Sequence, residues 1–271
     1  MARSKGFSLV ELAVALAIIA LLIAGALIPL STQMDVRNVA DTKRSMESIR
    51  DAITGFAQAN GRLPCPADGT VAAGVAGAGT EQVSGTTCTG SGSVFFGVVP
   101  WATLGVPEVD GWGRRYSYWV SPIFADGLPP TVTTWSSVGQ SPACNPTPAP
   151  IQSSFALCSQ GVITVNARNE STHATTALGL ALPAVIISHG KNGAGAYTPG
   201  GVTLVAPTGA DEFANATHTN AATTFYSRIP TPAASSCNDA AVGTFCEFDD
   251  IVVMITSNVL IARMVAAGRL P

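Results

Sequence analysis

A single carboxylate, Glu11, stands at the start of the most apolar part of the chain. A charged side chain inside a membrane helix costs roughly 2.5–3.5 kcal/mol on insertion scales, so Glu11 requires a partner of opposite charge. No Lys or Arg lies between Phe7 and Asp35. The remaining cation at the same depth is a newly exposed α-amino group of a neighbouring copy, and a cut after Gly6 would create one on Phe7. The spacing therefore indicates a charge pair between subunits of an assembly.

The residues around Glu11 have the pattern of a membrane segment. Residues 12–30 contain no polar or charged side chain, and a helix of this length is about 28 Å long, close to the roughly 30 Å hydrocarbon core of a bilayer. Arg3 and Lys5 precede the segment, and the positive-inside tendency keeps them in the cytoplasm. Everything after Leu30 is therefore expected on the far side of the membrane.

The order of a basic leader, Gly6, Phe7, Glu11 and an apolar helix closely resembles the class III signal of type IV prepilins and type II secretion pseudopilins. The resemblance implies a prepilin peptidase that cuts after Gly6 and methylates the amine of Phe7. It also implies that Glu11 aligns an incoming subunit with the Phe7 amine of a subunit already in the filament. The implied partners are this peptidase, other pilin or pseudopilin subunits, and the inner-membrane assembly platform.

Two other interpretations fit parts of the N-terminus. Ala24-Gly25-Ala26 is an A-x-A sequence after an apolar run, as in a conventional secretory signal peptide. However, the run is longer than the usual core of about 7–15 residues, and Glu11 interrupts the place where that core should begin. A plain single-span anchor explains the apolar run but leaves the G-F-x-x-x-E spacing unexplained.

The composition favours an exported protein. Charged residues make up 11% of the 271 residues, against about a quarter in typical soluble proteins. The net charge is −3, and removal of residues 1–6 leaves 12 basic against 17 acidic residues. Because an acidic chain lacks the basic surface that a nucleic acid requires, no nucleic acid is expected as a partner.

Six cysteines lie beyond the apolar N-terminus, and none forms a C-x-x-C pair of the kind that binds metals. An even number in loop-like sequence indicates disulfides formed in an oxidising compartment such as the periplasm. Pairing between neighbours would close three compact loops, although buried free thiols are an alternative. The predicted disulfides are Cys65–Cys88, Cys144–Cys158 and Cys237–Cys246.

The rest of the chain predicts an α+β fold. From Asp35 to Asn60 apolar residues recur at three- and four-residue steps, which indicates an amphipathic helix that continues the membrane helix and ends at Gly61. Pro29 inside this long helix invites a kink or local melting, or it only marks the exit from the membrane. Strands are expected at residues 94–99, 116–120, 161–166, 184–188 and 250–255, and a short helix from residue 257 to 267. We expect a pilin-like architecture, in which the long helix is laid across an antiparallel sheet and its stripe from Val36 to Phe56 covers that sheet.

A second resemblance lies in residues 110–118, Asp-Gly-Trp-Gly-Arg-Arg-Tyr-Ser-Tyr, which are similar to the D-x-W-G-x-x-Y-x-Y hairpin of pseudopilin-like proteins. Arg114 and Arg115 among these aromatic residues could form a stacking platform for single-stranded DNA, as in some competence pilins. The acidic total favours the other interpretation, a strand with alternating faces.

Catalytic motifs are absent from the sequence: it contains no G-x-S-x-G elbow, H-E-x-x-H pair or P-loop. The three histidines, at positions 173, 189 and 218, are scattered through polar sequence and are expected in solvent. The sequence therefore predicts a protein that is not an enzyme.

The resemblance to pseudopilins bears on calcium as well, because major pseudopilins hold calcium in a C-terminal loop of oxygen ligands. Residues 188–195 resemble the opening of that loop, but Lys191 and Asn192 stand where acids would be expected. No cofactor is therefore expected. The residues that could still supply carboxylates to calcium are Glu247, Asp249 and Asp250.

Together these features predict a structural subunit, and its length and long loops indicate a minor one, of a type IV pilus or a type II secretion pseudopilus. The expected organisation is a prepilin leader (1–6), a transmembrane and assembly helix (7–30) and a periplasmic α+β domain with long loops (31–271). The protein is expected in the bacterial inner membrane as a single-pass protein and then in the filament. The alternatives are a filament-tip adhesin or DNA-binding pilin that uses the loops between residues 129 and 236, and a conventionally secreted periplasmic enzyme.

Overall fold

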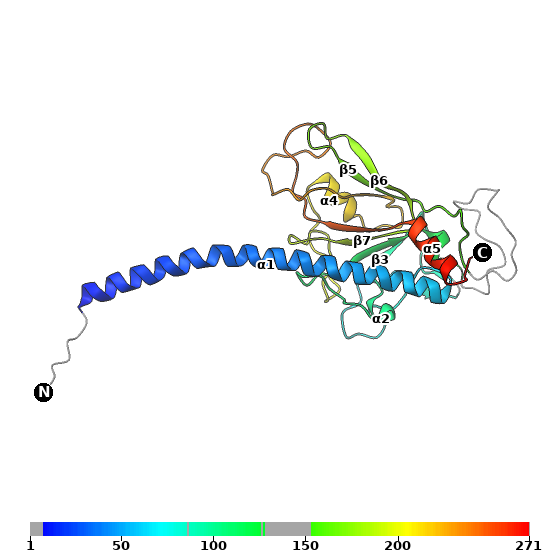
Figure 1. Cartoon of the computed structure of the whole chain (residues 1–271), viewed down its shortest axis with the longest axis horizontal. Coiled ribbons are helices and arrows are strands. Elements are labelled where there is room, and N and C mark those ends of the chain that lie inside the picture. The colour runs from blue at the N-terminus through cyan, green and yellow to red at the C-terminus, as the bar shows by residue number, and fades with distance from the viewer. Residues whose placement is uncertain (1–7, 86, 126, 128–152, 271) are drawn as a thin grey trace.

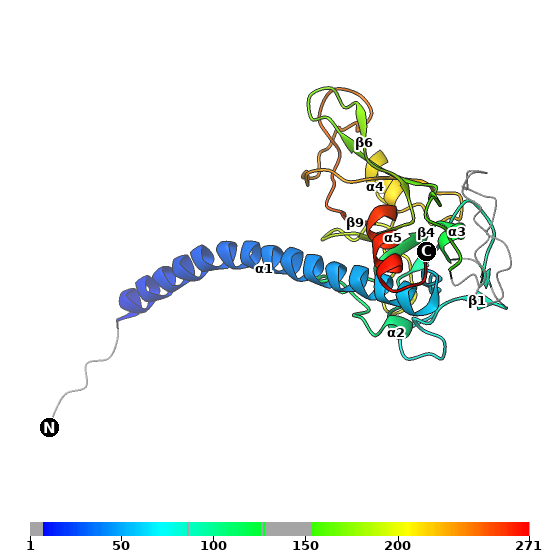
Figure 2. The same ribbon diagram turned by 45° about the vertical axis from the view of Figure 1, so that its right-hand side comes forward.

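One long helix dominates the architecture of the chain in this computed structural model. The helix α1 (Leu9–Asn60) has 52 residues, which corresponds to about 78 Å. Its N-terminal half projects beyond the rest of the molecule, while its C-terminal half lies against the folded domain (Figures 1 and 2). The structure describes residues 8–85, 87–125, 127 and 153–270, without the side chains of residues 22–32.

The sequence predicts two features of the α1 backbone, its end at Gly61 and an effect of Pro29. α1 ends at Gly61, which adopts a left-handed φ of 74° and donates its N–H to the carbonyl oxygen of Ala57 at 2.7 Å, as the sequence predicts. At Pro29 the backbone remains helical, and α1 curves smoothly rather than breaking (Figure 1). The two halves of α1 therefore form one continuous helix in the single chain, without the kink or local melting that Pro29 could introduce.

A four-stranded antiparallel sheet lies across the C-terminal half of α1. Its order is β3 (Phe95–Val98), β4 (Ser117–Val120), β7 (Ala184–Ser188) and β9 (Ile251–Ile255). All four strands fall where the alternation and the apolar runs of the sequence predict them. The α+β class and the antiparallel pairing of this sheet are confirmed.

The face of α1 that contacts the sheet is shorter than predicted. The fully buried residues on this face of α1 are Thr42, Met46, Ile49, Ile53 and Ala57, at steps of three and four. Val36, by contrast, is 65% exposed. The predicted cover from Val36 to Phe56 is therefore wrong at its N-terminal end, because the helix has already passed the edge of the sheet there.

A second sheet covers the opposite face of the first, and the sequence predicted only one of its strands, at residues 161–166. Its order is β6 (Thr175–Leu182), β5 (Ile163–Arg168) and β8 (Thr224–Tyr226), with β5 and β8 parallel. Trp119, Val185 and Ile187 of the first sheet pack against this second layer. As a result β4 is buried on both faces, and its side chains alternate between the two faces of the first sheet, as the sequence predicts.

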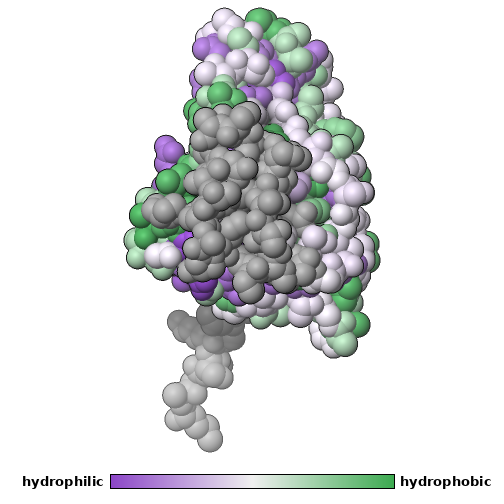
Figure 3. All heavy atoms as spheres, turned by 90° about the vertical axis from the view of Figure 1, so that its right-hand side faces the viewer, coloured by the Kyte–Doolittle hydropathy of each residue, from purple (hydrophilic) through white to green (hydrophobic). Residues whose placement is uncertain are grey.

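Short elements complete the described chain. Two of them, β1 (Val83–Ser84) and β2 (Thr87–Cys88), pair as a small hairpin. The short helices are α2 (Trp101–Leu104), α3 (Pro122–Ala125), α4 (Ala210–Asn215) and α5 (Ser257–Ala266). α5 corresponds to the helix predicted near the C-terminus, and it packs beside the C-terminal end of α1 (Figure 2). On the face seen from that end, hydrophobic and hydrophilic residues are intermixed (Figure 3).

Two of the three predicted disulfides are confirmed. Cys65 bonds to Cys88, and Cys237 bonds to Cys246. Cys158 is also disulfide-bonded, whereas Cys144 lies outside the described residues, so the pairing of these two stays a prediction. The alternative of buried free thiols is wrong for the cysteines that the structure describes.

The buried stripe of α1 can be tested with one core substitution. Ile53→Ala in a chain that begins at Asp35 is expected to lower the free energy of unfolding by about 2–5 kcal/mol, because it leaves a cavity between helix and sheet. Val36→Ala is the matched control and should change that value by less than about 0.5 kcal/mol. Urea denaturation followed by circular dichroism measures both. Equal effects would contradict the assigned boundary of the buried stripe.

Candidate functional site

The N-terminal end of α1 is the first part of the candidate site. Ser8 is the N-cap: its hydroxyl accepts a hydrogen bond from the backbone N–H of Glu11 at 3.3 Å. In return, Oε2 of Glu11 accepts the backbone N–H of Ser8 at 2.9 Å. This reciprocal pair is a capping box, which satisfies two of the free donors at the start of a helix. Gly6 and Phe7 lie outside the described residues.

The capping box gives Glu11 a role that was missed from the sequence, although the S-x-x-E spacing signals it. The bond to Ser8 fixes the carboxylate at the tip of the helix. Because an ionised carboxylate has about four acceptor positions, this one bond leaves capacity for a cation from another molecule. The capping box therefore orients the carboxylate of Glu11 and leaves it able to pair with a cation.

An uncovered apolar surface follows directly after this end. The described side chains from Ser8 to Leu21 are all exposed, with Leu9 at 87% and Leu21 at 74%. Contiguous apolar surface of this extent marks a site of contact with lipid or protein. Over the residues whose side chains are described, no helix has the length and hydropathy that crossing a membrane requires.

A cluster of three carboxylates is the second candidate site. Glu212 of α4 and the consecutive residues Asp249 and Asp250 place oxygen atoms within 4.8 Å of one another. The predicted group was Glu247, Asp249 and Asp250, so the structure replaces Glu247 with Glu212. Since Glu212 is 37 residues from Asp249 in the sequence, only the fold brings the two together.

Amide groups satisfy much of this cluster. The side-chain amide of Asn192 donates to both carboxylate oxygens of Glu212 at 3.2 and 3.3 Å, and the backbone N–H of Asn192 donates to Asp249 at 2.8 Å. The side chain of Asn215 donates to Asp250 at 2.8 Å. Oδ1 of Asp249 is buried without a hydrogen-bond partner in the described structure. Oxygen donors of this kind suit calcium, although the sequence predicts that no cofactor is bound.

Burial makes the ionised cluster unfavourable. Burial, together with the neighbouring Asp250 carboxylate, raises the pKa of Glu212 to about 8. Burial also raises the pKa of Asp249 to about 6. Glu212 therefore holds a proton at neutral pH when only amides surround it. Lys191 stands where the resemblance to the pseudopilin calcium loop implies an acid. Its side chain pairs with Asp35 of α1 at 2.7 Å.

His173 and His189 are buried and His218 is partly buried, so the prediction that the histidines lie in solvent is wrong. His173 and His189 lie in the interior of the two-layered domain. His218 stacks between Phe96 and Tyr197 with ring centroids at 4.7 and 4.8 Å, and burial lowers its pKa to about 4. The second sheet and its loops, which the sequence did not reveal, provide this cover.

One of these histidines lies in an arrangement that resembles a catalytic triad. The hydroxyl of Ser117 lies 2.8 Å from Nε2 of His189, and Nδ1 of His189 lies 3.6 Å from Asp250. However, Ser117 and His189 are both 0% exposed, so a substrate cannot reach the hydroxyl. The three residues form a polar link inside the core.

The aromatic and arginine side chains of residues 110–119 also lie largely inside the domain. Arg115 is fully buried, pairs with Glu108 at 2.8 Å and lies over the ring of Trp101. Tyr118 and Trp119 are buried on opposite faces of the first sheet. A stacking platform for single-stranded DNA requires exposed rings, so that interpretation is wrong for this segment.

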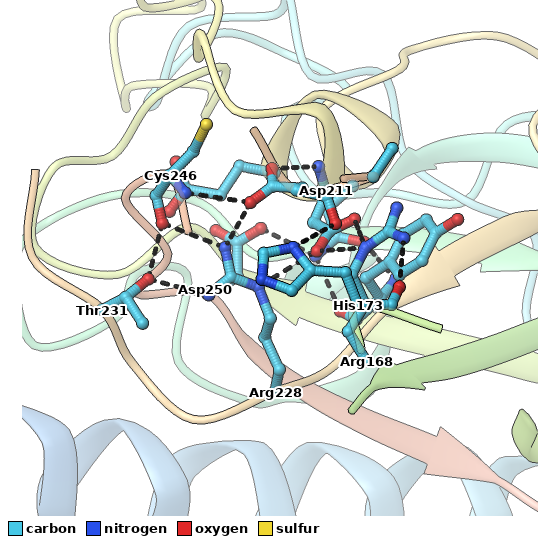
Figure 4. Close-up of polar contacts among 12 residues, drawn as sticks. Arg168, His173, Asp211, Arg228, Thr231, Cys246 and Asp250 are labelled. Carbon is cyan, nitrogen blue, oxygen red and sulfur yellow. Dashed lines mark hydrogen bonds and ion pairs between the residues drawn. The ribbon is translucent and has the colours of Figure 1, made fainter. Parts of the chain in front are cut away.

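A buried ion-pair network attaches the Cys237–Cys246 loop to the second sheet (Figure 4). Arg168 of β5 and Arg228 both donate to the carboxylate of Asp211, at 2.7 and 3.0 Å. Arg228 also reaches Asp239 and the carbonyl oxygen of Cys246, both at 3.0 Å. Because each charge is paired within the interior, the network holds the loop in one position.

Comparison with known families identifies the N-terminus. Residues 1–27 match the prokaryotic N-terminal methylation motif, the prepilin-type signal of type IV pilins and pseudopilins, which confirms the resemblance predicted from the sequence. This motif indicates a structural rather than a catalytic protein, anchored in a membrane and then assembled with other pilin subunits after processing by prepilin peptidase. Comparisons with curated proteins and with solved structures give no match.

The carboxylate cluster makes stability depend on pH. The folded-state pKa of Glu212, about 8, lies above its ordinary value of 4.5, so the folded state binds more protons between these values. Stability is therefore expected to be full below about pH 4.5 for this group and to fall as pH rises to 8. Melting temperatures measured from pH 5 to 9 check this, with Glu212→Gln as the variant that should flatten the decline.

The same pH series, repeated in the presence of calcium, tests whether the carboxylate cluster binds a divalent cation. A bound divalent ion favours ionised carboxylates, so binding would restore stability at high pH. An unchanged series would mean that the amide donors alone serve the cluster. Glu247→Gln is the matched control, because Glu247 lies outside the group of three carboxylates.

Proposed function

We propose that this protein is a minor structural subunit of a type IV pilus or a type II secretion pseudopilus. The observation that carries the proposal is the apolar N-terminal half of α1, which projects from the domain and bears the methylation motif. No contact within the described chain covers this surface. Packing against the same helix of neighbouring subunits would bury it, as a filament requires.

Processing would prepare this helix for assembly. Prepilin peptidase would cut after Gly6 and methylate the new amine of Phe7, leaving the apolar segment attached to the domain. Residues 7–30 would span the inner membrane, with residues 31–271 in the periplasm. The disulfides at Cys65–Cys88 and Cys237–Cys246 support an oxidising compartment for the domain.

Glu11 would align each incoming subunit. Its carboxylate, oriented by the capping box, would pair with the Phe7 amine of a subunit already in the filament. In an apolar environment the attraction between two such charges is far stronger than in water. The pair would therefore set the axial position at which two helices pack.

The minor role is supported by the bulk of the domain. The second sheet adds a layer on the side of the first sheet away from α1, so the domain extends far from the helix (Figure 1). Such breadth suits a position with few lateral neighbours. The assembly platform in the inner membrane and other pilin subunits are the proposed partners.

The mature N-terminus provides the first test. Mass spectrometry of the protein from its native membrane is expected to find N-methylated Phe7 as the first residue, because the cut lies before the apolar helix. A mature chain that begins at Leu27 would contradict the proposal and support a conventional signal peptide ending at Ala26.

Two substitutions separate the charge of Glu11 from its capping role. Glu11→Gln keeps an oxygen that can accept the Ser8 N–H but removes the charge, so processed protein should accumulate in the membrane with about tenfold less in filaments, equivalent to roughly 1.4 kcal/mol. Ser8→Ala removes the hydroxyl cap, at a cost of about 0.5–2 kcal/mol to the helix, and keeps the charge. It should still assemble. Immunoblots of sheared filaments and membranes measure both, and the reverse result would assign the role to capping.

A further inference from the structure

The strand β9 leaves one edge of the first sheet open. It pairs with β7 on one side only. Immediately before β9, Phe248 exchanges two backbone hydrogen bonds with Thr231, but in the described chain no such pairing continues along the strand. β9 has the sequence Ile-Val-Val-Met-Ile, without the charges or prolines that usually protect an exposed edge. Its main chain is therefore available to another strand.

Two cavities lie beside this edge, between β9 and the flank of α1. One, of about 590 Å³, is bounded by Thr54 and Gly55 of α1, Met254 of β9 and Arg263 of α5. The other, of about 390 Å³, lies further toward the N-terminus of α1, against Lys43 and Val252. We call the two cavities together the β9 groove.

Gly55 indicates that the groove accommodates a side chain of another molecule. Glycine in the interior of a helix costs stability relative to alanine. A Cβ at Gly55 would meet nothing within 4 Å, so packing within the described chain does not require glycine there. A side chain arriving from another molecule would explain the missing Cβ.

Two unpaired cations along the groove favour an acidic segment as its occupant. Three of the five cations that line it are paired: Arg50 with Asp51, Lys191 with Asp35, and Arg228 with Asp211 and Asp239. The carboxylates of Asp249 and Asp250, which also line it, accept hydrogen bonds from Asn192 and Asn215. Lys43 and Arg263, one in each cavity, have no ion-pair partner in the described part of the chain. From Lys43 to Gln58, which donates to the carbonyl oxygen of Arg263, α1 rises about 22 Å, the length of roughly seven strand residues.

We propose that the β9 groove binds an extended acidic segment of a neighbouring filament subunit, which adds to the first sheet as a fifth strand. Its main chain pairs with β9, which requires the extended conformation, and its carboxylates lie near Lys43 and Arg263 about seven residues apart. A side chain of the segment occupies the space over Gly55. The inference rests on the proposed function, because it requires an adjacent subunit.

Filling the groove in the full-length protein tests the proposal. Gly55→Phe is expected to lower the amount in filaments about tenfold while processing and disulfides remain normal. Gly55→Ala should assemble as the unchanged chain does, because a methyl group leaves most of the cavity open. Ser48→Phe is the matched bulky control, since Ser48 is exposed on α1 and lines neither cavity. Arg263→Glu, which needs no space, should also lower incorporation.

A photoreactive benzophenone side chain at position 55 identifies the occupant. In assembled filaments it is expected to cross-link to an acidic, extended segment of another subunit, which mass spectrometry of the joined peptides would reveal. Cross-links only to lipid or to the same chain, or normal incorporation of both Gly55→Phe and Arg263→Glu, would overturn the groove proposal alone. If the unchanged chain were absent from filaments, both this proposal and the proposed function would be overturned.

Discussion

The apolar surface of the N-terminal half of α1 is the constraint on which the rest of the structure depends. A helix that exposes leucine and valine on every side is unfavourable in water, so this surface requires lipid or protein to cover it. The domain then has to hold only the C-terminal half of the helix. This division explains why the buried face of α1 starts at Thr42, whereas Val36 is exposed.

Covering the first sheet on both faces has consequences for its polar residues. With α1 on one side and the second sheet on the other, β4 contains no exposed position, and the arginine, histidine and serine side chains beside it must find partners inside. Arg115 pairs with Glu108, and Ser117 with His189. Groups that resemble catalytic or nucleic-acid-binding residues in the sequence thus serve as internal links, because burial of an unpaired polar group is costly.

The charged groups of the domain divide into two kinds. In the network around Asp211 two arginines balance two carboxylates, which fixes the Cys237–Cys246 loop. In the cluster of Glu212, Asp249 and Asp250 three acids share amide donors and lack a balancing cation among the described residues, so burial raises pKa values instead. The first arrangement is complete within the chain. The second is the place where pH or a cation alters stability.

The sequence by itself determined the long helix, its end at Gly61, the four strands of the first sheet, α5 and the N-terminal motif. These features depend on local periodicity, on capping residues and on a contiguous signal. Neighbour pairing also identified two disulfides, because short loops close readily. Only the tertiary structure decided the second sheet, the buried histidines and the replacement of Glu247 by Glu212. Each of these joins segments far apart in a chain rich in Ala, Thr and Gly, whose weak patterns carry little information about long-range contacts.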